Sequence, residues 1–345
     1  MRKNLKKMIV FLLILGILFV QIQDVLRYKW ENHEFISTRL QHYMDEDDPI
    51  DVLFFGSSPV YAGITPIAMW NSNGITGMNF GTSLENALCN YFQFEFAIQE
   101  QLPKVVVLDL AALFEERKAD EEVYEATYRK IAETMPNKKL KEQMINEIVD
   151  TNENQDKLSY YFPLLRYHAR WNELEKTDFV PIRWYKNYFK GGLLNNVSKP
   201  IEAKIDKVYN IDELEIADYS VQYYKQIIER CKNLGINMLV FSPPQFERNF
   251  NYAKFALIEK FCESMDVDYV NYNEDKNLEK LNLNFNKDFY DPGHLSVSGS
   301  IKLTIDLGER IQKLYSLENH KADSGYEEWN EQWDAFLEVY SEQIE

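Results

Sequence analysis

The stretch Asp51-Val-Leu-Phe-Phe-Gly-Ser-Ser-Pro-Val-Tyr61 decides how the rest of the 345-residue chain is interpreted. A short apolar run ends at Gly56 and is followed by two hydroxyl side chains, Ser57 and Ser58. Short apolar runs bounded by turn residues predict strands of a covered parallel sheet. A serine directly after such a strand is expected at the carboxyl edge of the sheet, where open α/β folds bind ligands. A strand followed by a helix-capping serine fits the same pattern, so the stretch alone leaves both interpretations open.

Strands and helices alternate on both sides of a charged central region. Apolar runs predict strands at residues 50–56, 77–81, 104–110, 236–242 and 267–272. Helical patterns lie at residues 66–70, 86–101, 219–234 and 250–265, and in a closing segment that ends near residue 315. This alternation predicts an α/β fold with a doubly wound parallel sheet. Residues 114–212 break the rhythm with charged, partly helical and aromatic-rich sequence, which predicts an insertion that covers one side of the sheet.

Composition limits the classes of function. Hydrophobic residues make up 45% of the chain, enough for a sizeable core in one large or two small domains. The formal charge of −17 argues against nucleic acid as a partner, because phosphates require basic side chains. Three scattered cysteines (Cys89, Cys231, Cys262) are too few for a disulfide framework or a zinc site, and Cys231 and Cys262 are expected to be core thiols. Without a P-loop, GxGxxG, CxxC or HExxH pattern, no metal and no cofactor is expected.

The N-terminus predicts a membrane anchor over residues 1–26. Four basic residues within the first seven precede an apolar run at 8–20, which nearby apolar residues extend toward a spanning length. A cleaved signal peptide fits less well, because no small-residue cleavage site follows the run. With the basic end in the cytoplasm, the rest of the chain is expected outside it, at the cell membrane on a single helix. Residues 27–48 are expected to form a juxtamembrane linker, residues 49–315 the α/β domain and residues 316–345 an amphipathic tail.

The tail carries a stripe of apolar side chains. Within residues 327–344 they fall on one face of a predicted helix: Trp329, Trp333, Phe336, Tyr340 and Ile344. A helix packed on its own domain and a docking helix for a membrane partner both fit this stripe.

One histidine has the neighbours that a catalytic base requires. A nucleophilic serine needs a base within hydrogen-bond reach, and the base needs a carboxylate that orients it. Of the five histidines, only His294 follows an acid at short, stiff spacing, because Pro292 and Gly293 restrict the loop after Asp291. Such an Asp can reach Nδ1 of the imidazole and select the tautomer whose Nε2 accepts a proton. An Asp-Pro-Gly turn with an incidental histidine fits the spacing equally well.

Three short motifs resemble blocks I, II and V of the SGNH/GDSL hydrolases. They are Gly56-Ser57-Ser58, Asn79-Phe-Gly81 and Asp291-x-x-His294, and the resemblance covers residues 50–110 and 236–312. The layout is similar to that of the membrane-anchored, extracytoplasmic branch, whose members accompany membrane-bound O-acyltransferases in polysaccharide acetylation. The teichoic-acid D-alanylation protein of Gram-positive bacteria has a similar layout. The resemblance implies a three-layer, flavodoxin-like SGNH fold.

The resemblance also implies roles for individual residues. Ser58 matches the nucleophile, His294 the base and Asp291 the acid that orients the base. The backbone N–H groups of Ser58 and Gly81 match two donors of an oxyanion hole, which stabilises a tetrahedral intermediate. Ser57 is expected beside the substrate.

Two positions depart from the family's pattern. The aspartate of the GDS signature is replaced by Ser57, and the Gly-x-Asn-Asp of block III is absent. The strand at 104–110 instead runs into Leu108-Asp-Leu-Ala-Ala112, so the third oxyanion donor is unassigned. The candidates for this donor are Asn79, Thr82, Ser83 and Asn86.

Two residues of the insertion are candidates for contacts with the acceptor substrate. Arg166 and His168 lie in the stretch 164–171, which also resembles a recurring segment of that branch. Ion pairs with nearby aspartate and glutamate explain Arg166 and the neighbouring Arg170 equally well.

The function implied by the resemblance is an extracytoplasmic serine acyltransferase or esterase. It would act on O-acyl groups, in the first place O-acetyl groups, of a cell-envelope polysaccharide through a Ser-His-Asp triad and an acyl-enzyme. The expected partners are an acylated glycan or other acyl donor and an integral-membrane O-acyltransferase. The alternative is a catalytically inactive SGNH-fold module that binds glycan or docks on a partner, which the missing block III favours. The sequence does not distinguish a transferase from an esterase, because the two activities differ in how well the site excludes water.

Overall fold

The central sheet has five parallel strands. The computed structural model describes residues 2–27, 39–115, 122–150, 155–180, 189–192, 207–246 and 251–344. Their sheet has the order β2-β1-β3-β4-β5, which confirms the predicted α/β fold with a parallel sheet. Each strand lies inside an apolar run that predicted it: β1 (Val52–Phe55), β2 (Gly77–Asn79), β3 (Val105–Leu108), β4 (Asn237–Ser242) and β5 (Asp268–Asn271).

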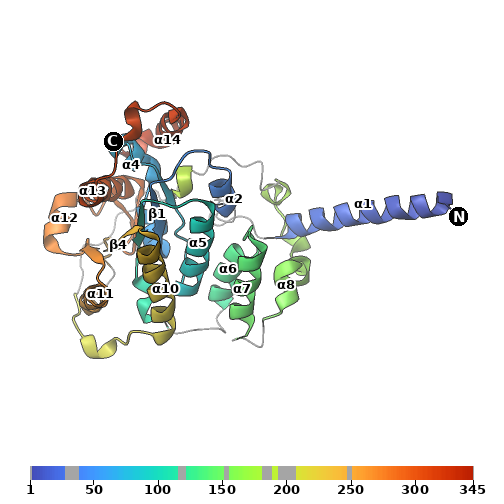
Figure 1. The fold of residues 1–345 in the computed structure, drawn as a ribbon, viewed down its shortest axis with the longest axis horizontal. Helices are drawn as coiled ribbons and strands as arrows, with labels where there is room; N and C mark the ends of the chain where they lie inside the picture. The colour runs from blue at the N-terminus through green and yellow to red at the C-terminus, as the bar shows by residue number, and fades with distance from the viewer. Residues whose placement is uncertain are drawn as a thin grey trace.

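Helices cover both faces of the sheet (Figure 1). Side chains of the buried strands alternate between the faces, so that Leu53 and Phe55 join one core and Val52 and Phe54 the other. The first core includes residues of α5 (Ala87–Glu100), α10 (Asp218–Leu234) and α11 (Ala253–Ser264). The second includes residues of α3 (Ser58–Gly63), α4 (Pro66–Asn73), α12 (Asp275–Leu281) and α13 (Val297–Tyr315).

The strand order creates a switch point beside the stretch that opened the sequence analysis. From β1 the chain passes to β2 on one side and then returns as β3 on the other side of β1. Ligands of open α/β folds bind outside the carboxyl ends of strands at such a point. Ser57 follows β1 there and Asp109 follows β3, so these loops border the expected binding crevice.

Two short elements at this edge were not predicted. Helix α3 begins at Ser58, and Pro59 fits its first turn because that turn needs no N–H donor from the proline. Strands β6 (Phe289–Asp291) and β7 (His294–Leu295) form an antiparallel hairpin where the sequence indicated a turn.

The described part of the predicted insertion packs on α5. Helices α6 (Glu122–Ala132) and α7 (Lys138–Val149) contact α5, so this region covers a helical layer of the domain. Four short elements follow: α8 (Lys157–Tyr161), α9 (Leu164–Tyr167) and the 3-10 helices η3 (His168–Asn172) and η4 (Lys176–Phe179). The predicted aromatic residues within 181–188 lie outside the described residues.

One apolar helix projects from the body (Figure 1). It is α1 (Arg2–Leu26), and its 23 residues Asn4–Leu26 are long and apolar enough to cross a membrane and mostly exposed. These properties fit a signal anchor or a signal peptide.

The segment predicted as a juxtamembrane linker packs on the domain in its second half. Helix α2 (Arg39–Met44) buries Arg39, Leu40 and Tyr43, whereas residues 28–38 lie outside the described part of the chain.

The tail helix packs on its own domain. Helix α14 (Glu327–Ile344) contacts α4 and α13 and buries Trp329, Phe336 and Tyr340. Trp329 also donates a hydrogen bond to Asp48 at 2.9 Å. The first of the two interpretations of this stripe is confirmed, and the buried aromatic face is not available for docking. The expectation of core thiols is also confirmed, because all three cysteines are free and buried.

Gly56 is a position at the sheet edge that tolerates no side chain. Its φ is +151°, and an added Cβ would lie 2.4 Å from Val60 Cγ2 and 2.9 Å from Asp109 Cβ. We expect Gly56→Ala to lower the free energy of unfolding by about 3 kcal/mol or more. Gly235 is the matched control, because it also has positive φ but no atom within 4 Å of an added Cβ. Gly235→Ala should cost about 1 kcal/mol in the same urea titration. Equal losses for the two variants would contradict this account of Gly56.

Candidate active site

Ser57 and Ser58 lie at the carboxyl edge of the sheet, between β1 and α3. Ser57 is the N-cap residue of α3, and its carbonyl accepts hydrogen bonds from Val60 N at 3.0 Å and Tyr61 N at 3.1 Å. Its hydroxyl makes no capping hydrogen bond. Ser58 is the first residue of the helix, and both serines are half-buried. Both serines therefore lie at the predicted edge of the sheet. The Ser57 side chain does not cap α3, so helix capping does not account for its hydroxyl.

Asp291 and His294 form a pair across the β6–β7 hairpin. The Asp291 oxygens lie 2.8 and 2.9 Å from His294 Nδ1, and Gly293 N donates to the same carboxylate at 2.8 Å. Burial raises the pKa of Asp291, but the hydrogen bonds from His294 and from the Gly293 backbone outweigh it, so the net pKa is lowered. An ionised Asp291 makes Nδ1 the donor and leaves Nε2 of a neutral imidazole as an acceptor.

A fully buried carboxylate anchors this hairpin. Asp288 accepts hydrogen bonds from Ser298 Oγ at 2.7 Å, from Lys302 Nζ at 2.6 Å and from the Asn284 backbone at 2.6 Å. On the other side, the Phe246 backbone donates to the carbonyl of Pro292 at 2.7 Å. Asp288 was not among the predicted site residues, although an aspartate directly before the aromatic residues Phe289 and Tyr290 was a signal for it.

The fold brings the serine and the histidine to neighbouring elements. Helix α3, which starts at Ser58, packs on β7, which starts at His294, and α13 contacts both. In the described part of the chain no hydrogen bond joins Ser58 to His294. Catalytic hydrogen bonds are often long in unliganded sites and tighten when the substrate binds.

The predicted oxyanion donors differ in their surroundings. Ser58 N lies in the first turn of α3, where a helix leaves its amides without an internal acceptor. Gly81 N instead donates to Asn79 Oδ1 at 2.9 Å, and Asn79 Nδ2 donates to the carbonyls of Val60 and Ile64 at 3.0 Å. The buried Asn79 amide therefore ties β2 to α3, and Gly81 N would have to leave Asn79 to serve an oxyanion.

The other candidates for a third donor fall into two groups. The hydroxyl of Thr82 donates to the Phe80 carbonyl at 3.3 Å. Asn86 caps α5, and its Nδ2 donates to the Tyr128 hydroxyl at 2.7 Å. Both side chains are thus engaged within the fold. Ser83 is half-buried, and its backbone carbonyl accepts a hydrogen bond from the Thr127 hydroxyl at 3.0 Å.

Asp109 is a buried acid directly behind Gly56. Its backbone N donates to the Phe55 carbonyl at 3.0 Å, and Ala111 N donates to its Oδ1 at 3.2 Å. Its Oδ2 is buried and has no hydrogen-bond partner among the described residues. Burial raises the pKa of Asp109 to about 7, against an opposing effect of Lys254. No role was predicted for Asp109 from the sequence of this strand end.

Arg39 is a buried cation that lies close to α3. Its guanidinium donates to the carbonyl of Gly81 and lies 4.7 Å from the centre of the Tyr61 ring. It was missed because residues 27–48 were predicted to be a linker. An arginine followed by the apolar residues Leu40 and Tyr43 was the available signal of a helix packed on the domain.

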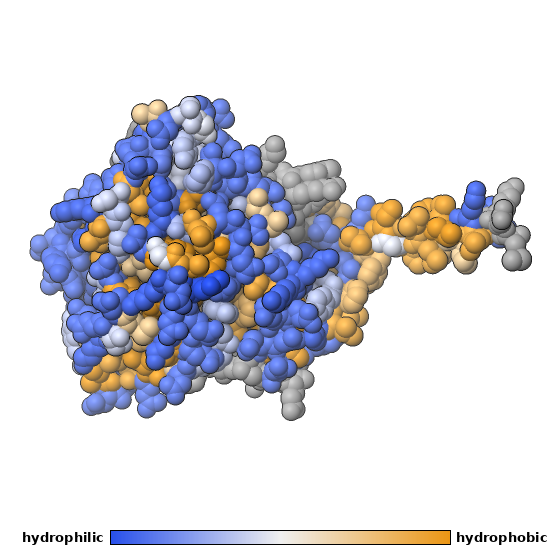
Figure 2. Space-filling view, in the orientation of Figure 1, coloured by the Kyte–Doolittle hydropathy of each residue, from blue (hydrophilic) through white to orange (hydrophobic). Residues whose placement is uncertain are grey.

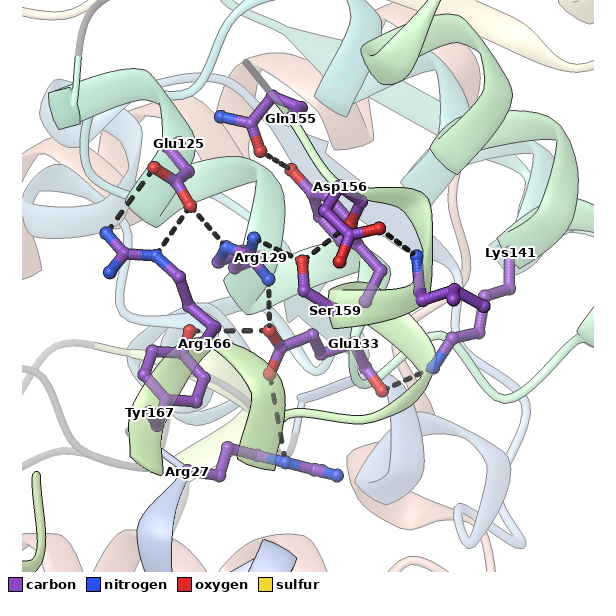
Figure 3. A network of polar contacts seen from close by, with 12 residues as sticks. Arg27, Glu125, Arg129, Glu133, Lys141, Gln155, Asp156, Ser159, Arg166 and Tyr167 are labelled. Atoms are coloured by element: carbon purple, nitrogen blue, oxygen red, sulfur yellow. Dashed lines mark hydrogen bonds and ion pairs between the residues drawn. The ribbon is translucent and has the colours of Figure 1, made fainter. Parts of the chain in front are cut away.

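Arg166 and His168 belong to a different part of the molecule. Arg166 pairs with Glu125 at 2.9 Å (Figure 3), which is the geometry of the ion-pair interpretation. The His168 ring is exposed, with Nδ1 3.2 Å from the Leu165 carbonyl. Their elements α9 and η3 pack on α1, whereas α3 packs on β7 and α13. The structure groups the two residues with the apolar helix and not with Ser58.

The raised pKa of Asp109 predicts a pH effect on stability. A buried acid with a folded pKa near 7 stabilises the fold fully below its unfolded pKa of 3.8, and the contribution is lost as the pH rises through 7. Asp109→Asn keeps the shape and cannot ionise. We expect its unfolding free energy relative to the native chain to rise by roughly 1–3 kcal/mol between about pH 5 and about pH 8 in urea titrations. A difference that does not change with pH would contradict the assignment.

Comparison with models of known protein families finds no match, and comparison with curated protein sequences finds none either. The fold and the site therefore describe an α/β protein with a five-stranded parallel sheet, without assigning it to a family.

Proposed function

We propose that the chain is a serine acyltransferase or esterase of the SGNH type. The observation that carries the proposal is the hydrogen-bonded Asp291–His294 pair on a hairpin that packs against the helix beginning at Ser58. An ionised acid, an oriented imidazole and a serine at the carboxyl edge of a parallel sheet are the parts that acyl transfer requires.

The proposed reaction has two halves. Ser58 Oγ gives its proton to Nε2 of His294 and attacks the carbonyl carbon of an acyl ester. The Ser58 N–H donates to the oxyanion, and collapse of the intermediate expels the alcohol with the proton from His294. The alcohol of an acceptor sugar, or water, then attacks the acyl-serine by the same steps in reverse order.

We place the activity outside the cytoplasm, on O-acetyl or other O-acyl groups of a cell-envelope polysaccharide. Helix α1 supports this location as a signal anchor whose basic residues stay in the cytoplasm. An integral-membrane O-acyltransferase is the proposed partner. The buried stripe of α14 gives no support to this partner, so the proposal of a membrane partner rests on the anchor.

A non-catalytic binding module is the second candidate. The observation in its favour is that Gly81 N and the Asn79 amide already make hydrogen bonds within the fold. Neither group is then free to donate to an oxyanion, so the oxyanion hole is incomplete in this structure.

One experiment separates the candidates. The full chain in detergent is incubated with an O-acetylated oligosaccharide and an unacetylated acceptor, and mass spectrometry scores release against transfer of acetyl groups. Transfer supports the transferase, and release without transfer supports the esterase. Binding of the oligosaccharide by calorimetry, with neither reaction, would replace the catalytic proposal by the binding module.

A further inference from the structure

Side chains of the insertion hold the carboxyl end of α1 where it meets the body, and we call this place the junction. Arg170 Nη1 donates to the carbonyls of Leu26 at 2.9 Å and Arg27 at 3.0 Å, at the carboxyl end of α1. A cation at this end satisfies carbonyls that a helix leaves open and interacts favourably with its dipole. Arg170 is itself held by Asp178 of η4 at 2.6 Å, and that carboxylate is almost fully buried.

A second layer of charges supports the junction (Figure 3). Arg27 lies 3.8 Å from Glu133, the residue that directly follows α6. Glu133 also accepts hydrogen bonds from Arg129 at 3.1 Å and from the Tyr167 hydroxyl at 3.3 Å. These buried or half-buried contacts join α1 to α6, α9 and η4 at once. The direction of α1 relative to the insertion is therefore set by the fold.

An apolar rim lies on the elements that adjoin this junction, because α9, η3 and η4 contact α1 and α8 contacts α9. We define it as the exposed large apolar side chains of α8, α9, η3 and η4 together with the residue that follows α8: Leu158, Tyr161, Phe162, Leu165, Trp171 and Phe179. Trp171 is 72% exposed and Phe162 is 42% exposed. In Figure 2, apolar residues continue from α1 onto the adjoining flank of the body. Isolated exposed apolar residues need no explanation, but a group of this size at one place marks an interaction surface.

From the carboxyl end of α1, the rim extends back along the helix toward its N-terminus. The rings of Phe162 and Phe19 lie 6.3 Å apart. Phe19 precedes Leu26, the last residue of α1, by seven residues, which at a rise of roughly 1.5 Å per residue is about 10 Å of helix. If α1 spans a bilayer over Asn4–Leu26, the level of Phe162 is already within the membrane.

We infer that the apolar rim of the insertion lies in the outer interfacial layer of the bilayer that α1 crosses. The lipid surface is the occupant because a spanning α1 brings it to the rim without any further partner. Aromatic and aliphatic side chains beside a spanning helix are typical of this layer. The α/β domain is thereby held at a set height and orientation above the membrane. The inference uses α1 as an anchor and is independent of the catalytic proposal.

The three buried cysteines allow a direct test, because a single new exposed cysteine can be labelled selectively. Variants Phe162→Cys and Trp171→Cys of the full chain receive an environment-sensitive fluorophore and are placed in nanodiscs of phosphatidylcholine and phosphatidylglycerol. Val339→Cys on α14, a residue that is 59% exposed, is the control. We expect spin-labelled lipids to quench both rim labels several-fold more than the control, and aqueous iodide to quench them several-fold less.

Two outcomes would overturn the inference. If iodide quenches the rim labels as strongly as the control label, the rim lies in water. Rim labels protected from both quenchers would show that protein covers them. Using two rim positions keeps the test decisive if one variant does not fold, and neither outcome bears on the activity of Ser58.

Discussion

Replacement of Ser58 by alanine is expected to abolish acyl-ester turnover, with kcat falling by about three to six orders of magnitude. The reason is that no acyl-enzyme can form without Oγ, while the fold is retained because the hydroxyl makes no hydrogen bond in the described part of the chain. The measurement is hydrolysis of an aryl acetate by the full chain in detergent, with circular dichroism to verify folding.

Ser57→Ala is the matched control for this prediction. Ser57 is the neighbouring half-buried serine, and its carbonyl, not its hydroxyl, supports α3. The variant should keep kcat within about one order of magnitude, with any effect mainly on KM if Ser57 contacts the substrate. Equal losses in the two variants would mean that the loop tolerates no substitution, and a fully active Ser58→Ala would remove the serine from the mechanism.

Asp291→Asn is expected to lower kcat by about 10⁴-fold. The amide of asparagine can donate to Nδ1 of His294, which favours the tautomer whose Nε2 carries the proton and cannot accept one from Ser58. Binding of substrate does not involve this step, so KM should change little. The full chain is assayed over a range of pH, and kcat and KM are determined separately.

A second His–Asp pair in the chain provides the control. Asp323 Oδ2 lies 2.8 Å from His320 Nδ1, and the two residues are three positions apart, as Asp291 and His294 are. His320 begins the 3-10 helix η8 (His320–Ala322), and Asp323 directly follows it. Asp323→Asn should leave kcat unchanged, although it replaces the carboxylate of a comparable His–Asp hydrogen-bonded pair. A similar loss of activity in both variants would show that the effect of Asp291 is on general stability and not on the base.

The sequence predicted the framework of the fold because its strands are short apolar runs with clear ends. All five parallel strands fall within such runs, and the Asp291–His294 pair forms as the stiff Pro-Gly spacing indicated. These features are local in the chain. A local sequence pattern is therefore sufficient to predict them without knowledge of the fold.

The remaining features depend on contacts between distant segments. The amide of Asn79 is occupied by carbonyls of α3, and Asp109 is buried because Gly56 lets β1 and β3 approach closely. Arg39 reaches the end of β2 from a segment predicted as a linker. Neither spacing nor periodicity within any of these segments specifies such partners.

Labelling with a fluorophosphonate tests whether Ser58 is an activated nucleophile. This reagent phosphonylates serines that are activated by a neighbouring base, and intact-mass measurement followed by peptide mapping locates the adduct. We expect one adduct on the native chain, on Ser58, and none on Ser58→Ala or His294→Gln. An adduct on another serine, or ester turnover by a chain that carries no adduct, would contradict this expectation.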